Sequence, residues 1–390
     1  MKIAVVCDSF KGSLTSKDAC AAVKDGLLRC NKNFEVLSLP FADGGEGTSR
    51  CFYDILGGQL RKAAVHDPLL REITAEYTVL PDGTAVIDVA SASGLTLLKS
   101  SERDAVKVSS LGSGELICDA AEHGAKHIIL GLGGSATTDA GTGILYALGM
   151  RFFSEDGVEV LPDGQNMIRV KKIRRTENFE RFKDIKFTLA CDVTNPLCGE
   201  NGAAYVFSPQ KGASKNDVKL LDDGLRNIGE IFEKASGKKI INLPGAGAAG
   251  GIGGGLSAFL NCELQSGFDV LARAASLEDK IRRSDAVITG EGKTDRQTLF
   301  GKLPKRVSDI AEKFGVPCIL LSGDVENDIS AEKLGVCEIH KIKENGISLE
   351  HCIKNAASLL SERAFAIGKD SKIINKQYSR KQEKMRENER

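Results

Sequence analysis

The sequence lacks an excess of charge of either sign and any long apolar run. Its 390 residues include 53 Lys and Arg and 53 Asp and Glu, so the formal net charge is zero. Nucleic-acid binders and polybasic membrane proteins need a positive field, and this balance argues against both. No apolar run approaches the ~20 residues that a membrane span needs, and the apolar run before Asp8 is too short for the core of a signal peptide. We therefore expect a soluble, cytoplasmic protein.

Closely spaced metal ligands are lacking too. The chain has 11 cysteines and 5 histidines, with no Cys-x-x-Cys and no histidine pair at helical spacing. Zinc ribbons and thioredoxin-like centres need such spacing, so we expect neither. The cysteines are interpreted as small buried side chains in a reducing compartment. No fixed-period repeat is present, which excludes solenoids and propellers.

Glycine, by contrast, is abundant. It accounts for 42 residues, more than the usual ~7%, and its clusters follow apolar, β-branched runs. These runs alternate with helical patterns, which predicts an α/β protein with a mostly parallel sheet. Strands are expected at residues 3–7, 34–39, 127–132, 186–191, 286–289 and 317–322. Alternating runs at 75–80 and 84–89, joined by Pro-Asp-Gly, predict an antiparallel hairpin.

The length and the order of the expected strands predict two domains. Residues 1–66 and 285–368 are expected to form a Rossmann-like α/β domain, into which residues 67–284 are inserted as a second α/β domain. Residues 369–390 have almost no apolar side chains. They are expected to form a solvated helix or a flexible charged tail, with partner binding as the alternative.

Six of the glycine clusters combine glycines and acids directly after an expected strand. Ligands of open α/β sheets bind at this end of the strands, where glycine lets backbone N–H groups approach phosphate. Acids in the same place can hold Mg²⁺ or accept a proton. A single such loop is commonly only a turn, but several together predict a site that handles phosphate.

Three known phosphate-binding motifs are similar to parts of these loops. Gly290–Thr294 ends like a P-loop, but Val287 stands where that motif needs glycine. Gly245–Gly250 matches the dinucleotide fingerprint, yet no clear strand returns before Asp269, so an oxidoreductase is the weakest alternative. Gly131–Thr137 resembles the phosphate loop of galactokinase-like kinases, whose accompanying motifs are missing.

Seven longer motifs resemble the type I glycerate kinase family, in order over about residues 1–325 and more weakly to about 368. They are DSFKGSL (8–14), FADGGEGT (41–48), GLGGSATTD (131–139), ACDVTNPLCG (190–199), FSPQKGA (207–213), PGAGAAGG (244–251) and ITGEGKTDRQT (288–298). The departures are Leu70, where the family usually has glycine, Leu111, where it commonly has tyrosine, and the charged tail.

The resemblance implies a kinase that transfers the γ-phosphate of ATP, with Mg²⁺, to the C2 hydroxyl of D-glycerate, giving 2-phosphoglycerate and ADP. It also implies that the second domain is inserted in the first and that the active site lies in the interdomain cleft. We expect a monomer or homodimer. The alternative is a catalytically inactive nucleotide- or phosphate-binding sensor or scaffold, but binding alone would not require acids in every loop.

Phosphoryl transfer needs cations, backbone donors and a carboxylate near the attacking hydroxyl. Asp192 is the expected base with Asp8 as the alternative, and Lys11 is expected to bind a substrate carboxylate or a phosphate. The expected Mg²⁺ ligands are Asp43, Glu46, Glu291 and Asp295, for which turn formation is the competing interpretation. The expected substrate- and phosphate-binding residues are Ser9, Gly133, Gly134, Ser135, Thr137, Lys211, Gly250, Gly251 and Lys293, and Gly250 and Gly251 have close helix packing as an alternative role.

Overall fold

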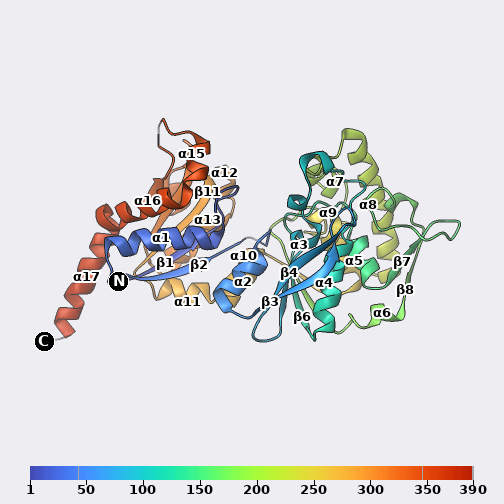
Figure 1. The fold of residues 1–390 in the computed structure, drawn as a ribbon, viewed down its shortest axis with the longest axis horizontal. Coiled ribbons are helices and arrows are strands. Elements are labelled where there is room, and N and C mark those ends of the chain that lie inside the picture. Colours follow the sequence, from blue (N-terminus) through green and yellow to red (C-terminus); the bar gives the residue numbers. More distant parts are fainter. Residues whose placement is uncertain (43, 345, 389–390) are drawn as a thin grey trace. The chain divides into compact units, whose positions relative to one another are not determined.

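The computed structural model describes residues 1–42, 44–344 and 346–388, with side chains up to residue 380. The chain divides into two compact units. Met1–Ala42 and Leu271–Arg390 form the terminal unit, and Asp43–Val270 form the central unit. Each unit has its own sheet and its own hydrophobic core, as an α/β protein requires (Figure 1). Over the described residues, none of the helices combines the length and hydropathy of a membrane span.

The terminal unit contains a five-stranded parallel sheet with the order β13-β12-β11-β1-β2. The strands are β1 (Lys2–Cys7), β2 (Glu35–Pro40), β11 (Ala286–Thr294), β12 (Cys318–Val325) and β13 (Glu338–Lys341). The helices are α1 (Ser16–Cys30), α11 (Leu277–Arg282), α12 (Arg296–Leu299), α13 (Leu303–Lys313), α14 (Ala331–Leu334), α15 (Leu349–Lys354), α16 (Ala356–Asp370) and α17 (Lys372–Asn388). Helix α10 (Gly267–Ala274) spans the second boundary between the units.

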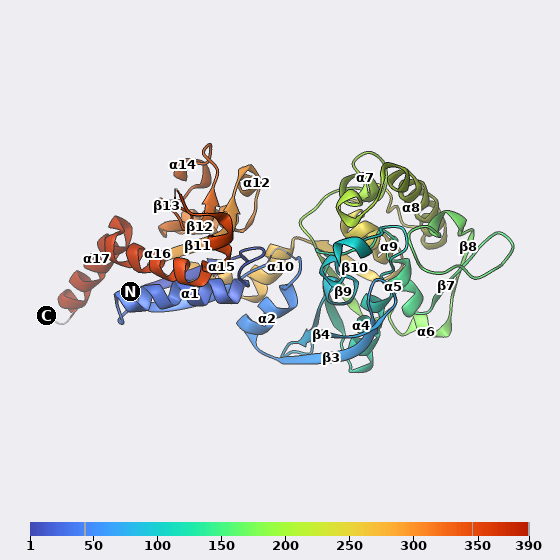
Figure 2. The same cartoon turned by 45° about the horizontal axis from the view of Figure 1, so that its top comes forward.

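Strand β1 shows why this sheet is parallel and covered on both faces. Its residues 3–7 are all buried, and alternate side chains point to opposite faces of a strand. Helices α1 and α16 cover one face and lie side by side in Figures 1 and 2. They approach so closely that a Cβ at Gly26 would lie 2.0 Å from the carbonyl oxygen of Ser361. The hydroxyl of Thr15 caps α1 by accepting the N–H of Asp18 at 3.1 Å.

The central unit contains a mixed six-stranded sheet with the order β10-β9-β6-β5-β4-β3 and a two-stranded β7–β8 sheet. The strands are β3 (Gln59–His66), β4 (Glu72–Val79), β5 (Ala85–Asp88), β6 (His127–Gly131), β7 (Met150–Phe153), β8 (Lys172–Arg175), β9 (Lys186–Ala190) and β10 (Asn261–Gln265). The helices are α2 (Thr48–Leu56), α3 (Ala90–Ser93), α4 (Leu111–Glu122), α5 (Thr142–Ala147), α6 (Glu177–Glu180), α7 (Ala203–Phe207), α8 (Lys215–Ser236) and α9 (Ala248–Phe259).

The expected hairpin is confirmed, because β4 and β5 pair in antiparallel register with Thr78 opposite Val86. Strand β10 was not expected from the sequence. It lies at the edge of the sheet and is only partly buried, so its residues lack the apolar pattern of a central strand. Residues 244–247 before α9 form turns and not a strand, so Gly245–Gly250 still lacks the strand that precedes a dinucleotide fingerprint.

The boundaries between the units differ from those expected. Residues 43–66 were assigned to the same domain as β1, but β3 pairs with β4 along its whole length and therefore belongs to the central unit. Residues 271–284 belong to the terminal unit, which begins within α10. Pairing of β3 with β4 decides the first boundary, and the second boundary lies within a helix.

The expectation of a wholly solvated tail is wrong for its first part. Residues 372–388 form α17, and Ile374 is fully buried in the core of the terminal unit. The ring of Tyr378 packs edge-on against Phe34 with ring centroids 5.8 Å apart. A few apolar side chains in a charged segment are thus enough to dock one turn of helix.

Candidate active site

The terminal unit brings together the motifs that follow β1 and β11. In the sheet order, β1 lies between β2 and β11, so the chain reverses its direction of winding between β1 and β11. In open parallel sheets, ligands bind outside the carboxyl ends of the strands at such a switch point. Asp8 follows β1 directly, and its N–H donates to the carbonyl oxygen of Gly290 on β11 at 2.9 Å. Ser9 comes next, and its N–H donates to Asp8 Oδ1 at 2.6 Å.

A glycine makes the approach of these two motifs possible. A Cβ at Gly292 would lie 3.1 Å from the Cα of Phe10 and 3.3 Å from the amide nitrogen of Lys11. A side chain at this position would therefore displace the loop that carries Lys11. The sequence pattern of glycines and acids thus places Lys11 beside Glu291–Lys293 in the structure.

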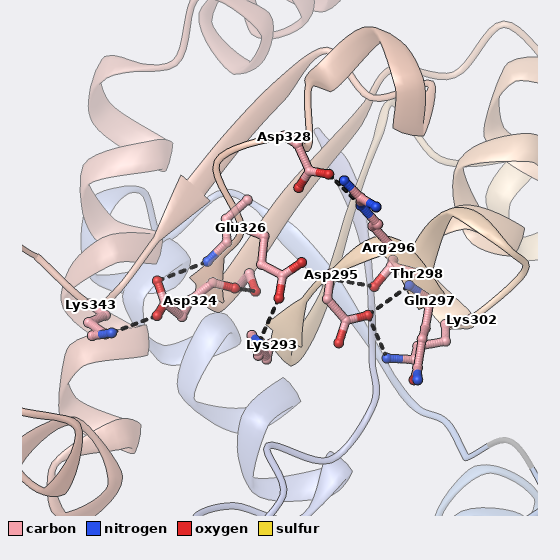
Figure 3. A network of polar contacts seen from close by, with 12 residues as sticks. Lys293, Asp295, Arg296, Gln297, Thr298, Lys302, Asp324, Glu326, Asp328 and Lys343 are labelled. Atoms are coloured by element: carbon pink, nitrogen blue, oxygen red, sulfur yellow. Dashed lines mark hydrogen bonds and ion pairs between the residues drawn. The ribbon is translucent and has the colours of Figure 1, made fainter.

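The carboxylates of this sheet edge are paired with cations or hydroxyl donors (Figure 3). Lys293 Nζ lies 2.8 Å from Glu326, and Lys302 Nζ lies 3.1 Å from Asp295. Further ion pairs join Arg296 with Asp328 at 2.6 Å and Lys343 with Asp324 at 2.7 Å. The network keeps the acidic edge close to electrical neutrality.

The two expected magnesium ligands in this network differ in environment. Glu291 is buried and accepts the hydroxyl of Thr298 at 2.7 Å, and burial raises the pKa of its carboxyl. Asp295 caps α12 by accepting the N–H of Gln297 at 2.9 Å. Its partial burial opposes ionisation, but the ion pair with Lys302 holds the pKa of Asp295 below its usual value.

Magnesium fits these residues only together with a phosphate. Among the described residues, no three His, Cys, Asp or Glu side chains are grouped so that they could hold a metal ion. Mg²⁺ is commonly bound by one or two carboxylates while phosphate oxygens and water supply the other ligands. Glu46, Glu291 and Asp295 are of the right chemistry for that role, and Asp43 lies outside the described residues.

The central unit contains a pocket of about 380 Å³ at the carboxyl ends of β6 and β9. This volume is within the range of small-molecule sites. Five expected site residues line it, namely Gly133, Gly134, Ser135, Asp192 and Lys211. The remaining wall is formed by Gly44, Gly45, Leu95, Leu132, Cys191, Val193, Phe207, Gln210, Ala248 and Ala249.

Two loops form one wall of this pocket, the glycine loop (residues 131–135) and the acidic loop (residues 44–47). The N–H of Gly133 donates to the carbonyl oxygen of Gly44 at 3.0 Å. A Cβ at Gly133 would lie only 2.5 Å from the Cα of Gly45, so a side chain there would separate the loops. Gly134 has φ +79°, a backbone conformation that residues with a side chain rarely adopt. Glycine is thus needed for both the contact and the turn.

A buried cation faces the glycine loop. Lys211 is 4% exposed, and its Nζ donates to Ser135 Oγ at 3.0 Å and to the carbonyl oxygen of Thr137 at 2.6 Å. Both acceptors are uncharged. Burial lowers the pKa of Lys211 to about 8, although the nearby Asp139 carboxylate opposes the shift. An anionic ligand in the pocket would supply the compensating charge that these acceptors lack.

Comparison with known proteins shows the family to which this chain belongs. The model of the glycerate kinase family matches residues 3–372. The chain is 41% identical over 330 residues to the glycerate 2-kinase of Escherichia coli K12, which covers 84% of this chain and 87% of that protein. It is 38% identical over 364 residues to a glycerate kinase of Halalkalibacterium halodurans, covering 93% and 96%. The chain belongs to the glycerate kinase family.

A solved structure agrees with this assignment. A crystal structure from Salmonella typhimurium LT2, named for glycerate kinase 2, superposes with a TM-score of 0.83 at 34% identity, covering 95% of this chain and 97% of that one. The resemblance inferred from the motifs is therefore confirmed, and the protein is a glycerate kinase. Membership of a kinase family implies the use of ATP. The family match ends at residue 372, so most of α17 lies beyond it.

Three expected residues of this kinase lie beside the pocket and not in its described lining. Thr137 is fully buried and contributes its carbonyl oxygen to Lys211. A Cβ at Gly250 would lie 2.0 Å from that carbonyl oxygen, and one at Gly251 would lie 2.9 Å from the Cα of Ala140. This geometry favours close packing over nucleotide binding for the two glycines.

Sequence reasoning missed two buried carboxylates beside the pocket. Asp139 accepts the N–H and the hydroxyl of Ser110 at 2.8 and 2.7 Å, which fixes the chain just after the glycine loop. Asp88 accepts the N–H groups of Gly47 and Ser49, and burial raises the pKa of Asp88 to about 7 against the effect of these donors. Asp88 ends a short apolar strand, the same signal that drew attention to the other acidic loops.

Proposed function

We propose that this glycerate kinase transfers the γ-phosphate of ATP to the C2 hydroxyl of D-glycerate, giving 2-phosphoglycerate and ADP. The choice of C2 is supported by the 41% identity with a relative named glycerate 2-kinase. The observation that carries the proposal is the buried Lys211 ammonium set against the glycine wall of the central-unit pocket.

In this proposal, the central-unit pocket binds the phosphates of ATP. The backbone of Gly133 and Gly134 lines the pocket without side chains, so a phosphate can approach it closely. The Ser135 hydroxyl and the Lys211 ammonium lie on the same wall, 3.0 Å apart. Phosphoryl transfer requires such fixed positive groups where charge develops on the transferred phosphoryl group.

Asp192 is proposed as the base that accepts the proton of the C2 hydroxyl. It follows β9 and lines the same pocket as Lys211. In the terminal unit, Lys11 is proposed to bind the carboxylate of glycerate, with Asp8 and Ser9 beside it. Their place at the switch point between β1 and β11 supports a ligand-binding role. Asp8 stays the alternative base.

Mg²⁺ is proposed to neutralise phosphate charge when it is bound. Glu291 and Asp295 in the terminal unit and Glu46 in the central unit are the described candidates to hold it. Lys293 is engaged with Glu326 and would have to leave that ion pair to reach a phosphate. The active site in an interdomain cleft, which the resemblance implies, stays a prediction, as does the state of a monomer or homodimer.

A coupled assay tests the position of phosphorylation directly. The enzyme is supplied with D-glycerate, MgATP, enolase, pyruvate kinase, lactate dehydrogenase and NADH, without phosphoenolpyruvate and without phosphoglycerate mutase. If the product is 2-phosphoglycerate, enolase converts it to phosphoenolpyruvate and NADH is consumed at one equivalent per turnover. The pyruvate kinase step also uses the ADP that the reaction forms.

Adding phosphoglycerate mutase separates the outcomes. NADH consumption that begins only after this addition identifies 3-phosphoglycerate and overturns the C2 assignment. A separate assay of ADP release with and without glycerate tests catalysis itself. ADP release that does not depend on glycerate would contradict the proposed reaction.

A further inference from the structure

A buried carboxylate next to the pocket has no role in the reaction as described so far. Asp88 is the last residue of β5, is 4% exposed, and pairs with Gly131 of β6. It is not among the described residues that line the pocket. We propose that Asp88 is a positioning residue of the kinase, which holds the acidic loop against the glycine loop and so sets the shape of the nucleotide pocket.

The two oxygens of Asp88 fix the start of α2. Oδ2 accepts the N–H of Gly47 at 2.9 Å, and Oδ1 accepts the N–H of Ser49 at 3.0 Å. The first N–H groups of a helix have no partners within the helix, and a side chain at the N-cap usually accepts one of them. The N-cap of α2 is Gly47, with φ +90° and no side chain. Asp88 therefore supplies the missing cap from a neighbouring strand.

The opposite end of the acidic loop is fixed on the glycine loop. Gly44 accepts the N–H of Gly133 at 3.0 Å, and Gly45 lies where a Cβ of Gly133 would be. Between the two anchors, the carboxylate of Glu46 accepts the hydroxyl of Thr96 at 3.3 Å. Only Glu46 separates Gly47, which Asp88 holds, from Gly45 in the pocket wall, so a shift of Gly47 would be passed on to Gly44 and Gly45.

Gly131 on the neighbouring strand β6 leaves space for the Asp88 carboxylate. A Cβ at Gly131 would lie 3.0 Å from Asp88 Oδ1 and 3.2 Å from the carbonyl oxygen of Gly44. Glycine at this position thus accommodates both the anchor and the loop that it holds. The two backbone donors use different oxygens of Asp88, and a carboxamide has an oxygen at only one of these two positions. Asp88→Asn would therefore turn an amide N–H₂ towards one of the two N–H groups.

The test compares Asp88→Asn with a matched control in the same unit. Asp222 on α8 is also buried and accepts a backbone N–H, that of Gly199 at 2.7 Å. Neither Asp222 nor Gly199 is among the described residues that line the pocket. Asp88→Asn loses one acceptor for a loop N–H, and Asp222→Asn loses the ion pair with Arg226 at 3.6 Å, so both are expected to lower the Tm. Only Asp88→Asn is expected to raise the KM for ATP, on the order of tenfold, and to weaken binding of ADP measured by calorimetry to the same extent.

The outcomes are distinguishable. If Asp88→Asn and Asp222→Asn lower the Tm alike and both leave the KM for ATP and the affinity for ADP unchanged, Asp88 is merely structural and the inference is wrong. The inference rests on the proposed function only where it assigns the pocket to the nucleotide. A rise in the KM for glycerate alone would support the positioning role of Asp88 and overturn that assignment.

A second variant keeps the test valid if Asp88→Asn does not fold. Gly131→Ala leaves the carboxylate in place but adds a Cβ 3.0 Å from its Oδ1. It is expected to reproduce the rise in the KM for ATP, since it displaces the same anchor by sterics instead of chemistry. A folded Gly131→Ala enzyme with an unchanged KM for ATP would contradict the inference.

Discussion

The amino group of Lys211 donates a hydrogen bond of 3.0 Å to the hydroxyl of Ser135. The two residues are far apart in sequence, and their contact joins the segment after α7 to the glycine loop. Lys211 is almost fully buried, and its second acceptor, the carbonyl oxygen of Thr137, is neutral. The charge of this lysine is thus poorly compensated in the free protein, which makes its ionisation sensitive to both pH and ligand.

Affinity for ATP is expected to fall as the pH rises from 7.5 to 9. Burial lowers the pKa of Lys211 to about 8, so the free protein loses this positive charge over that interval. A bound triphosphate favours the charged form of the lysine. One pH unit above this pKa only about a tenth of the free protein carries that charge, so the KM for ATP should be about tenfold higher there. Lys211→Met should bind ATP weakly with a flat profile. A flat profile for the unmodified enzyme would refute the role of Lys211.

Asp192→Asn is expected to lower kcat by ~10²–10⁴-fold while changing the KM for glycerate much less. A general base acts on the hydroxyl proton in the transition state, so its loss affects the chemical step more than binding. Steady-state kinetics of Asp192→Asn and Asp8→Asn provide the comparison. If Asp192→Asn retains nearly normal kcat and Asp8→Asn abolishes activity, the assignment of the base must be reversed.

Leu70→Gly is expected to stabilise the protein. Leu70 has φ +62° in the turn after Asp67 and is 47% exposed, so its side chain pays a conformational cost without full burial. Glycine relieves this strain, but it also raises the conformational entropy of the unfolded chain, which opposes folding. The net effect expected is a gain of about 0.5–1 kcal/mol in the free energy of unfolding. The neighbouring Leu69→Gly is the control and should be destabilising, because Leu69 packs against a buried cluster. Chemical denaturation measures the free energy of unfolding of both variants. A loss of stability in Leu70→Gly would show that the contacts of the leucine side chain stabilise the protein more than its backbone strain destabilises it.

Removal of residues 370–390 is expected to destabilise the terminal unit. Ile374 is fully buried and Tyr378 packs on Phe34. Loss of the buried isoleucine side chain alone should lower the free energy of unfolding by about 1.5–3 kcal/mol. A solvated or flexible tail, as expected from the sequence, would leave the Tm unchanged on this deletion. A truncation after Arg380 keeps both contacts and is the control for thermal unfolding. Equal Tm values for the two truncations would show that the docked turn contributes nothing.

The class of fold and the chemistry of the loops could be predicted from the amino-acid sequence alone. Short continuous apolar runs such as residues 3–7 are typical of strands that are buried on both faces, and a Pro-Asp-Gly turn between alternating runs predicts a hairpin. The motifs were long enough to identify the family, because each combines several residue types at fixed positions. These signals are local, so they do not depend on how the chain folds back on itself.

Which distant residues come into contact could not be predicted from the sequence and became clear from the folded structure. Gly250 and Gly133 look alike in the sequence, but one packs against the carbonyl oxygen of Thr137 and the other lines the pocket. Asp88 caps a helix that starts 40 residues earlier, and Ile374 of the charged tail reaches the core of the terminal unit. Such contacts depend on strand pairing and close packing between distant segments, and no local pattern encodes the partner of a buried side chain.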